Sequence, residues 1–144
     1  MHPSGAFAYA LLVVGLYLKY FVMIGIQGLE RRRSAVFRWP EDAAAWSGQV
    51  RPEAERVERA QAALRNASES EPLFLAASAA WIALGAQPFA ALSVCLGYVL
   101  IRSLHAFWLL VPRQPMRTRV FGLSQLCLLG VIIDLTRLAW FARS

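Results

Sequence analysis

The fold of this chain is decided by residues 72–111, PLFLAASAAWIALGAQPFAALSVCLGYVLIRSLHAFWLLV. One membrane-spanning helix needs roughly 20 residues, and this apolar stretch is about twice as long. Near its middle, Gly85-Ala86-Gln87-Pro88 has the composition of a turn. The stretch therefore predicts two antiparallel membrane-spanning helices with a tight connection between them.

Two further apolar runs flank this hairpin, from Ala6 to Leu29 and from about Thr118 to Phe141. At about 1.5 Å per residue, each run is long enough to cross the roughly 30 Å hydrocarbon layer of a bilayer. A secretory signal peptide is the alternative interpretation of the first run, but its basic cluster follows the apolar residues instead of preceding them. We therefore expect the first run to be retained as a span.

The second span needs residues from before Pro72, because Pro72 to Leu84 is too short to cross a bilayer alone. We expect residues 66–71 to supply the missing turns, and a cytoplasmic helix with Pro52 in its first turn to lead into them. The prediction is an all-α, integral membrane four-helix bundle that forms a single domain over residues 1–144. Its spans are predicted at about 6–29, 66–85, 88–111 and 118–141, and its cytoplasmic loop at about 30–52.

Composition limits the class of protein. The chain has 144 residues, of which 58% are hydrophobic and only 17% charged. Such a chain is too short for a multidomain enzyme and too apolar for a disordered protein. Cys95 and Cys127 stand alone in apolar runs and the two histidines are far apart, so the sequence predicts neither a disulfide framework nor a metal site.

The net charge of +6 is compatible with binding to nucleic acid or to a membrane, and the placement of the charges favours the membrane. Eleven of the fifteen basic residues lie in the connections before the second span and after the third. By the positive-inside rule these connections face the cytoplasm and both termini lie outside. Aromatic residues for stacking on nucleic acid are sparse there. The usage of arginine and alanine favours a bacterial inner membrane.

Ionisable residues inside the predicted spans are costly to bury without partners. Asp134 and Arg137 are three residues apart on one helix and are expected to form an ion pair. Lys19 and Arg102 are predicted at similar depths and need a carboxylate. Glu69 and Glu71 are the nearest candidates, and a buried network of Lys19, Arg102 and Glu69 is the hypothesis. Such a network could serve a binding site or could only fix the register of the helices.

A group of polar residues is predicted to gather at the cytoplasmic ends of the helices. Helical spacing places Arg102 with His105, Asn66 with Glu69, and Arg117 with Gln125. Hydrogen-bond donors dominate this group, which suits a small peptide-like anion that carries carboxylates and one amino group. The members of the predicted pocket are Arg31, Arg65, Asn66, Glu69, His105, Arg117, Thr118 and Gln125.

The order of these residues over nearly the whole chain resembles the MAPEG family, the membrane-associated proteins in eicosanoid and glutathione metabolism. The resemblance begins with Lys19 and Arg31 and includes Pro40-Glu41-Asp42-Ala43 in the loop. It continues through Val57-Glu58-Arg59, Arg65-Asn66, Glu69, Pro72-Leu73-Phe74-Leu75-Ala76, Arg102, His105, Pro115-Met116-Arg117-Thr118 and Gln125.

The resemblance implies a homotrimer that binds glutathione between neighbouring subunits, near the cytoplasmic side. The eight residues of the predicted pocket match glutathione contacts in the family. Arg117 matches the residue that stabilises the thiolate, Thr118 would donate a hydrogen bond to the sulfur, and Asp42 matches a residue proposed to assist isomerase chemistry. Phe121 is expected to contribute to the same cofactor-binding site.

The chain departs from the family pattern at four positions. Ala62 stands where the family usually has arginine, and Gly122 where prostaglandin-synthesising members have threonine. Leu109 and Phe121 replace two tyrosines of those members. These departures weaken the expected glutathione site and argue against prostaglandin synthesis. A narrower or altered thiol specificity is the alternative.

Two functions follow as hypotheses. The first is a glutathione-dependent enzyme, a transferase, peroxidase or isomerase, which activates the thiolate against a lipophilic electrophile or hydroperoxide from the bilayer. The alternative is a non-catalytic membrane module that binds a lipid or an anion. Expected partners are a second and third copy of the chain, glutathione, a lipophilic small molecule and membrane lipids, with no nucleic acid.

Overall fold

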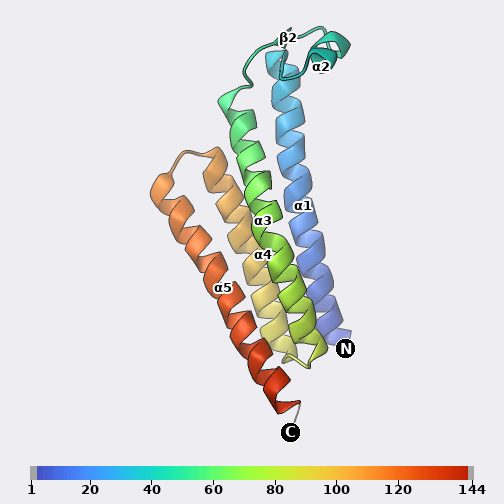
Figure 1. The fold of residues 1–144 in the computed structure, drawn as a ribbon, viewed down its shortest axis with the longest axis vertical. Coiled ribbons are helices and arrows are strands. Elements are labelled where there is room, and N and C mark those ends of the chain that lie inside the picture. Colours follow the sequence, from blue (N-terminus) through green and yellow to red (C-terminus); the bar gives the residue numbers. More distant parts are fainter. Residues whose placement is uncertain (1–2, 143–144) are drawn as a thin grey trace.

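The computed structural model describes residues 3–142 and is mostly helical. Four long helices lie alongside one another (Figure 1): α1 (Pro3–Ser34), α3 (Glu55–Ala83), α4 (Pro88–Leu110) and α5 (Gln114–Phe141). Between α1 and α3, the chain forms a short helix α2 (Pro40–Ala45) flanked by the two-residue strands β1 (Val36–Phe37) and β2 (Gln49–Val50), which pair in parallel. The described chain thus consists of long helices with one small structured loop.

The connection between α3 and α4 lies where the Gly-Ala-Gln-Pro sequence predicted a turn. Gly85 adopts a φ of 93°, a left-handed conformation that favours glycine. Gln87 caps α4, because its side-chain oxygen accepts a hydrogen bond from the Ala90 backbone N–H at 2.6 Å. Pro88 then occupies the first turn of α4, where its missing N–H is not needed.

The helices pack through small and aromatic side chains. α1 contacts α3 and α4, α4 contacts α5, and α3 contacts both α4 and α5. At the centre, the rings of Phe74 and Tyr98 stack with their centroids 3.5 Å apart. Both ends of the described chain lie at the same end of the molecule, and α2 lies at the opposite end (Figure 1).

Much of the apolar surface faces outward, which suits a lipid environment. Within residues 3–142, three helices are long and apolar enough to cross a membrane, namely α1, α4 and α5. Their outward faces expose large side chains such as Phe21, Leu100 and Leu126. α3 lies against all three, and it carries charged residues through its first half. These helices identify a membrane protein.

Helix bounds and the expected segments do not coincide everywhere. α1 continues past the apolar run, which ends at Leu29, to Ser34. The helix that leads into the second span begins at Glu55, so Pro52 lies before it and not in its first turn. Glu53, two residues before that helix, instead accepts hydrogen bonds from Arg31 Nε at 2.6 Å and from Gln61 Nε2 at 2.7 Å.

Candidate functional site

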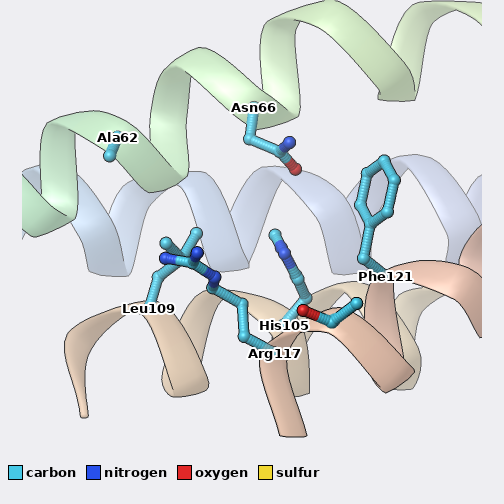
Figure 2. Close-up of a pocket in the computed structure, with 7 residues that line it drawn as sticks. Ala62, Asn66, His105, Leu109, Arg117 and Phe121 are labelled. Atoms are coloured by element: carbon cyan, nitrogen blue, oxygen red, sulfur yellow. The ribbon is translucent and has the colours of Figure 1, made fainter. Parts of the chain in front are cut away.

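A pocket opens among α3, α4 and α5, towards the end of the molecule that carries the α4–α5 connection. Its cavity measures about 330 Å³, within the usual range for small-molecule sites. Figure 2 shows how the side chains converge on this space from three helices. Seven residues line it: Ala62, Asn66, His105, Leu109, Arg117, Thr118 and Phe121.

Helical spacing explains why these residues meet. Ala62 and Asn66 are one turn apart on α3, as are His105 and Leu109 on α4, so each pair shares a face. Pro115 lies in the first turn of α5, which places Arg117 and its neighbour at the beginning of that helix. Because of these positions along the three helices, polar side chains from α3, α4 and α5 meet in one pocket.

Burial differs among the polar groups of the pocket. His105 is buried and its ring packs on the ring of Phe121, with the centroids 5.6 Å apart. Asn66 and Arg117 are half-buried, while Thr118 is exposed. The Thr118 hydroxyl donates to the Gln114 carbonyl at a long 3.4 Å. The pocket thus has a buried inner end and an open outer end.

Arg117 supplies the positive charge of the pocket. No carboxylate within residues 3–142 forms an ion pair with its guanidinium. A guanidinium offers five N–H donors in a fixed plane and stays charged at all physiological pH values. An anionic group is therefore the ligand that this pocket suits best.

The structure brings together five of the predicted site residues and leaves five outside the pocket. Asn66, His105, Arg117, Thr118 and Phe121 line it together. Arg65 and Glu69 are exposed and do not line it. Arg65 lies about 100° around α3 from Asn66, and Glu69, one turn after Arg65, lies on the same face as Arg65. Gln125 is half-buried one turn beyond Phe121, Arg31 pairs with Glu53, and Asp42 is exposed in α2. Whether these outer residues join the site in an assembly remains a prediction.

The apolar departures from the family pattern fall in this same pocket. Ala62, Leu109 and Phe121 all line it, with Ala62 and Leu109 on one side near Arg117 and Phe121 on the other side (Figure 2). The pocket therefore combines a cationic group with apolar surface on either side of it. This combination suits a ligand or a pair of ligands with one charged and one lipophilic part.

Behind the pocket, Lys19 of α1 and Arg102 of α4 share one carboxylate. That carboxylate belongs to Glu71, the second of the two candidate glutamates, and the hypothesis that Glu69 completes the network is wrong. Arg102 Nε donates to Glu71 Oε1 at 3.1 Å, and Lys19 pairs with the same oxygen. Glu71 lies on the buried stripe of α3 with Ala67 and Phe74, whereas Glu69 is exposed. The spacing of small and apolar residues on α3 could have identified it.

The predicted ion pair near the other end of α5 is confirmed. Arg137 Nε donates to Asp134 Oδ1 at 2.7 Å. The second oxygen of this carboxylate accepts a hydrogen bond from Trp81 Nε1 at 2.8 Å, which links α5 to α3. No spacing rule within one helix predicts this contact between helices.

Metal ligation has no support in the described part of the chain. Among residues 3–142, no three His, Cys, Asp or Glu side chains are grouped so that they could hold a metal ion. Cys95 is buried and Cys127 half-buried, and neither forms a disulfide.

The fold and the site define a helical membrane protein with a pocket between three of its helices that carries one unpaired arginine among the described residues. The sequence profile of the MAPEG family matches residues 7–136, which is nearly the whole chain. The protein belongs to the MAPEG family. Members of this family generally bind glutathione and form trimers, and they include transferases, peroxidases and isomerases as well as non-catalytic proteins. No curated protein sequence matches the chain.

Proposed function

We propose that this protein is a glutathione-dependent membrane transferase or peroxidase. The single observation that carries the proposal is the position of Arg117, which has no carboxylate partner within residues 3–142 and lies in a pocket with Asn66 and His105. Membership of a family that generally uses glutathione supports the same ligand.

The residues of the pocket fit glutathione chemically. Its carboxylates and peptide carbonyls are acceptors, and the polar side of the pocket presents donors from Asn66, Arg117 and Thr118. Bound glutathione would supply a sulfur nucleophile for attack on a lipophilic electrophile or hydroperoxide. No residue of the chain needs to form a covalent intermediate in such a reaction.

Arg117 is proposed to lower the pKa of the glutathione thiol. A free thiol with a pKa of about 8.5 is mostly protonated at neutral pH, and only the thiolate is a strong nucleophile. Each pKa unit by which a fixed cation favours the thiolate corresponds to about 1.4 kcal/mol. The Thr118 hydroxyl, bound only weakly to the Gln114 carbonyl, is free to rotate towards the sulfur and donate a second hydrogen bond.

The apolar side chains of the pocket, Ala62, Leu109 and Phe121, would receive the second substrate. Such a surface binds a lipophilic molecule that arrives from the bilayer, and it keeps water away from the nucleophile. We favour transfer or peroxide reduction over a prostaglandin-type isomerisation, although the order of motifs is similar to that of microsomal prostaglandin E synthase. Leu109 and Phe121 carry no phenol, and Asp42 does not line this pocket.

We further propose that the active form is a homotrimer with the site between subunits. Arg65 and Glu69 are exposed on α3 and would reach glutathione only in such an assembly, as would Arg31 and Gln125. Small exposed or half-buried residues on α3 allow another helix to approach closely; these are Ala76, Ala79, Ala80 and Ala83. Trimer formation in the family supports this arrangement.

An Arg117→Ala variant tests the proposed chemistry. We expect a loss of turnover with a lipophilic electrophile or hydroperoxide by roughly two to three orders of magnitude, because fixed electrostatic donors contribute about that much. The matched control is Arg119→Ala, which removes an exposed arginine of the same helix that does not line the pocket.

The outcome also separates catalysis from simple binding. If Arg117→Ala and wild type turn over equally, the proposed mechanism is wrong. If wild-type protein binds glutathione but shows no thiolate absorbance and no turnover, a non-catalytic module that binds lipids or anions is the better description.

A further inference from the structure

A chain of buried polar contacts leads from the middle of α1 to the pocket. Lys19 pairs with Glu71, and Arg102 Nε donates to the same carboxylate at 3.1 Å. The other end of the guanidinium reaches Asn66, because Arg102 Nη2 donates to Asn66 Oδ1 at 2.8 Å. Asn66 lines the pocket (Figure 2), and Arg102 is not among the residues that line it. Arg102 therefore reaches the pocket through Asn66.

This contact fixes which way the Asn66 amide faces. A guanidinium has donors and no acceptor, so the amide group that it meets must be the oxygen. Arg102 Nη2 also contacts the Asn66 backbone carbonyl at 3.3 Å, which holds the two residues in one relative position. The Nδ2 group is the opposite end of the same planar amide, and within residues 3–142 it makes no hydrogen bond. It is left available to a ligand.

Only arginine can make both contacts at once. Arg102 is 2% exposed, so its charge is held in the protein interior and needs the Glu71 carboxylate. A lysine at this position could satisfy Glu71 with its single ammonium group. The lysine ammonium could not also reach Asn66, because only the guanidinium carries several N–H donors at fixed positions in one plane.

We propose that Arg102 is a positioning residue that holds the Asn66 amide so that its NH₂ group donates to an oxygen acceptor of the bound thiol peptide. The partner group on the ligand is then a carboxylate or a peptide carbonyl and not an ammonium. This inference rests on the proposed function, because it assigns one contact of the proposed glutathione site.

The direction of the Asn66 amide is tested by comparing Asn66→Asp with Asn66→Ala. Aspartate keeps an oxygen for Arg102 but replaces the donor NH₂ with a second acceptor oxygen. We expect the Kd for glutathione, measured by calorimetry on the detergent-solubilised protein, to rise roughly tenfold for Asn66→Ala and further for Asn66→Asp. Wild-type or tighter binding by Asn66→Asp would overturn the proposal, because it would show that the ligand presents a donor.

The role of Arg102 is tested by a double-mutant cycle with Arg102→Lys. In the wild-type background we expect Arg102→Lys to weaken glutathione binding roughly fivefold to tenfold. In the Asn66→Ala background we expect no further loss, because Arg102 acts through the amide that is already absent. A purely structural role would produce the same loss in both backgrounds, and that result would overturn the proposal. Ser103→Ala, next to Arg102 on α4, is the control and should bind as wild type does.

The results distinguish this inference from the proposed function. If wild-type protein does not bind glutathione, both fail. If wild-type protein binds glutathione, and Arg102→Lys weakens that binding equally in the wild-type and Asn66→Ala backgrounds, only the proposed role of Arg102 is wrong. Should Arg102→Lys not fold, Arg102→Gln replaces it in the same two backgrounds, with the same expected and contradicting results.

Discussion

Single residues in this protein differ in importance according to the face of the helix they occupy. Glu69 and Glu71 are two residues apart on α3, yet one is exposed and the other holds two buried cations. The types and order of residues predicted that Lys19 and Arg102 need a carboxylate. Which glutamate supplies it depends on the rotation of α3 against α1 and α4, and that follows from packing.

Glu71→Gln is expected to destabilise the fold. Removing the carboxylate leaves Lys19 and Arg102 without a charged partner, and a broken buried ion pair costs about 3–5 kcal/mol. Thermal unfolding in detergent measures the effect. Glu69→Gln is the matched control and should stay within about 0.5 kcal/mol of wild type, as exposed substitutions do. Equal stability of the two variants would contradict the assignment of the buried network.

Whole elements were easier to predict than their contacts. The apolar runs identified the long helices, since a lipid-facing helix must hide its backbone polar groups and show apolar side chains. The structured loop around α2 was predicted only as a loop, because strands of two residues have no periodicity to recognise. The start of α3 was predicted too early. Glu53, just before the helix, pairs with Arg31 of α1, and this contact between distant residues is not visible in the local sequence.

The tight connection between α3 and α4 gives a test at the scale of elements. Gly85→Ala is expected to lower the stability by about 1 kcal/mol, because a side chain at a φ of 93° is strained. The same substitution at Gly97, inside α4 and with open space around it, should be neutral or stabilising by up to about 1 kcal/mol. Thermal unfolding of both variants is the measurement. A shift of the same sign in both would contradict the described turn.

At the scale of the whole molecule, the described chain holds only part of the expected site. Asn66, His105 and Arg117 meet in one chain, because their helices pack against one another. Arg65 and Glu69 face outward. The types of residue that a site needs can be predicted from the sequence, but in the proposed trimer the packing between copies would add contacts that spacing along one helix does not contain.

The proposed trimer predicts a mass. Native mass spectrometry of the detergent-solubilised protein should give three times the 16.0 kDa of one chain. Arg65→Ala should weaken glutathione binding while it leaves that mass unchanged, since the side chain is exposed in the single chain and is proposed to meet ligand in the assembly. A monomer that binds glutathione with full affinity would contradict the proposed shared site.

The central claim is that Arg117 turns a bound thiol into a thiolate, and titration of the purified protein with glutathione at neutral pH tests it most directly. The ultraviolet absorbance of the thiolate should appear in wild type with one thiolate per occupied site, and it should be lost in Arg117→Ala but kept in Arg119→Ala. Thiolate absorbance of the same size in Arg117→Ala would contradict the claim.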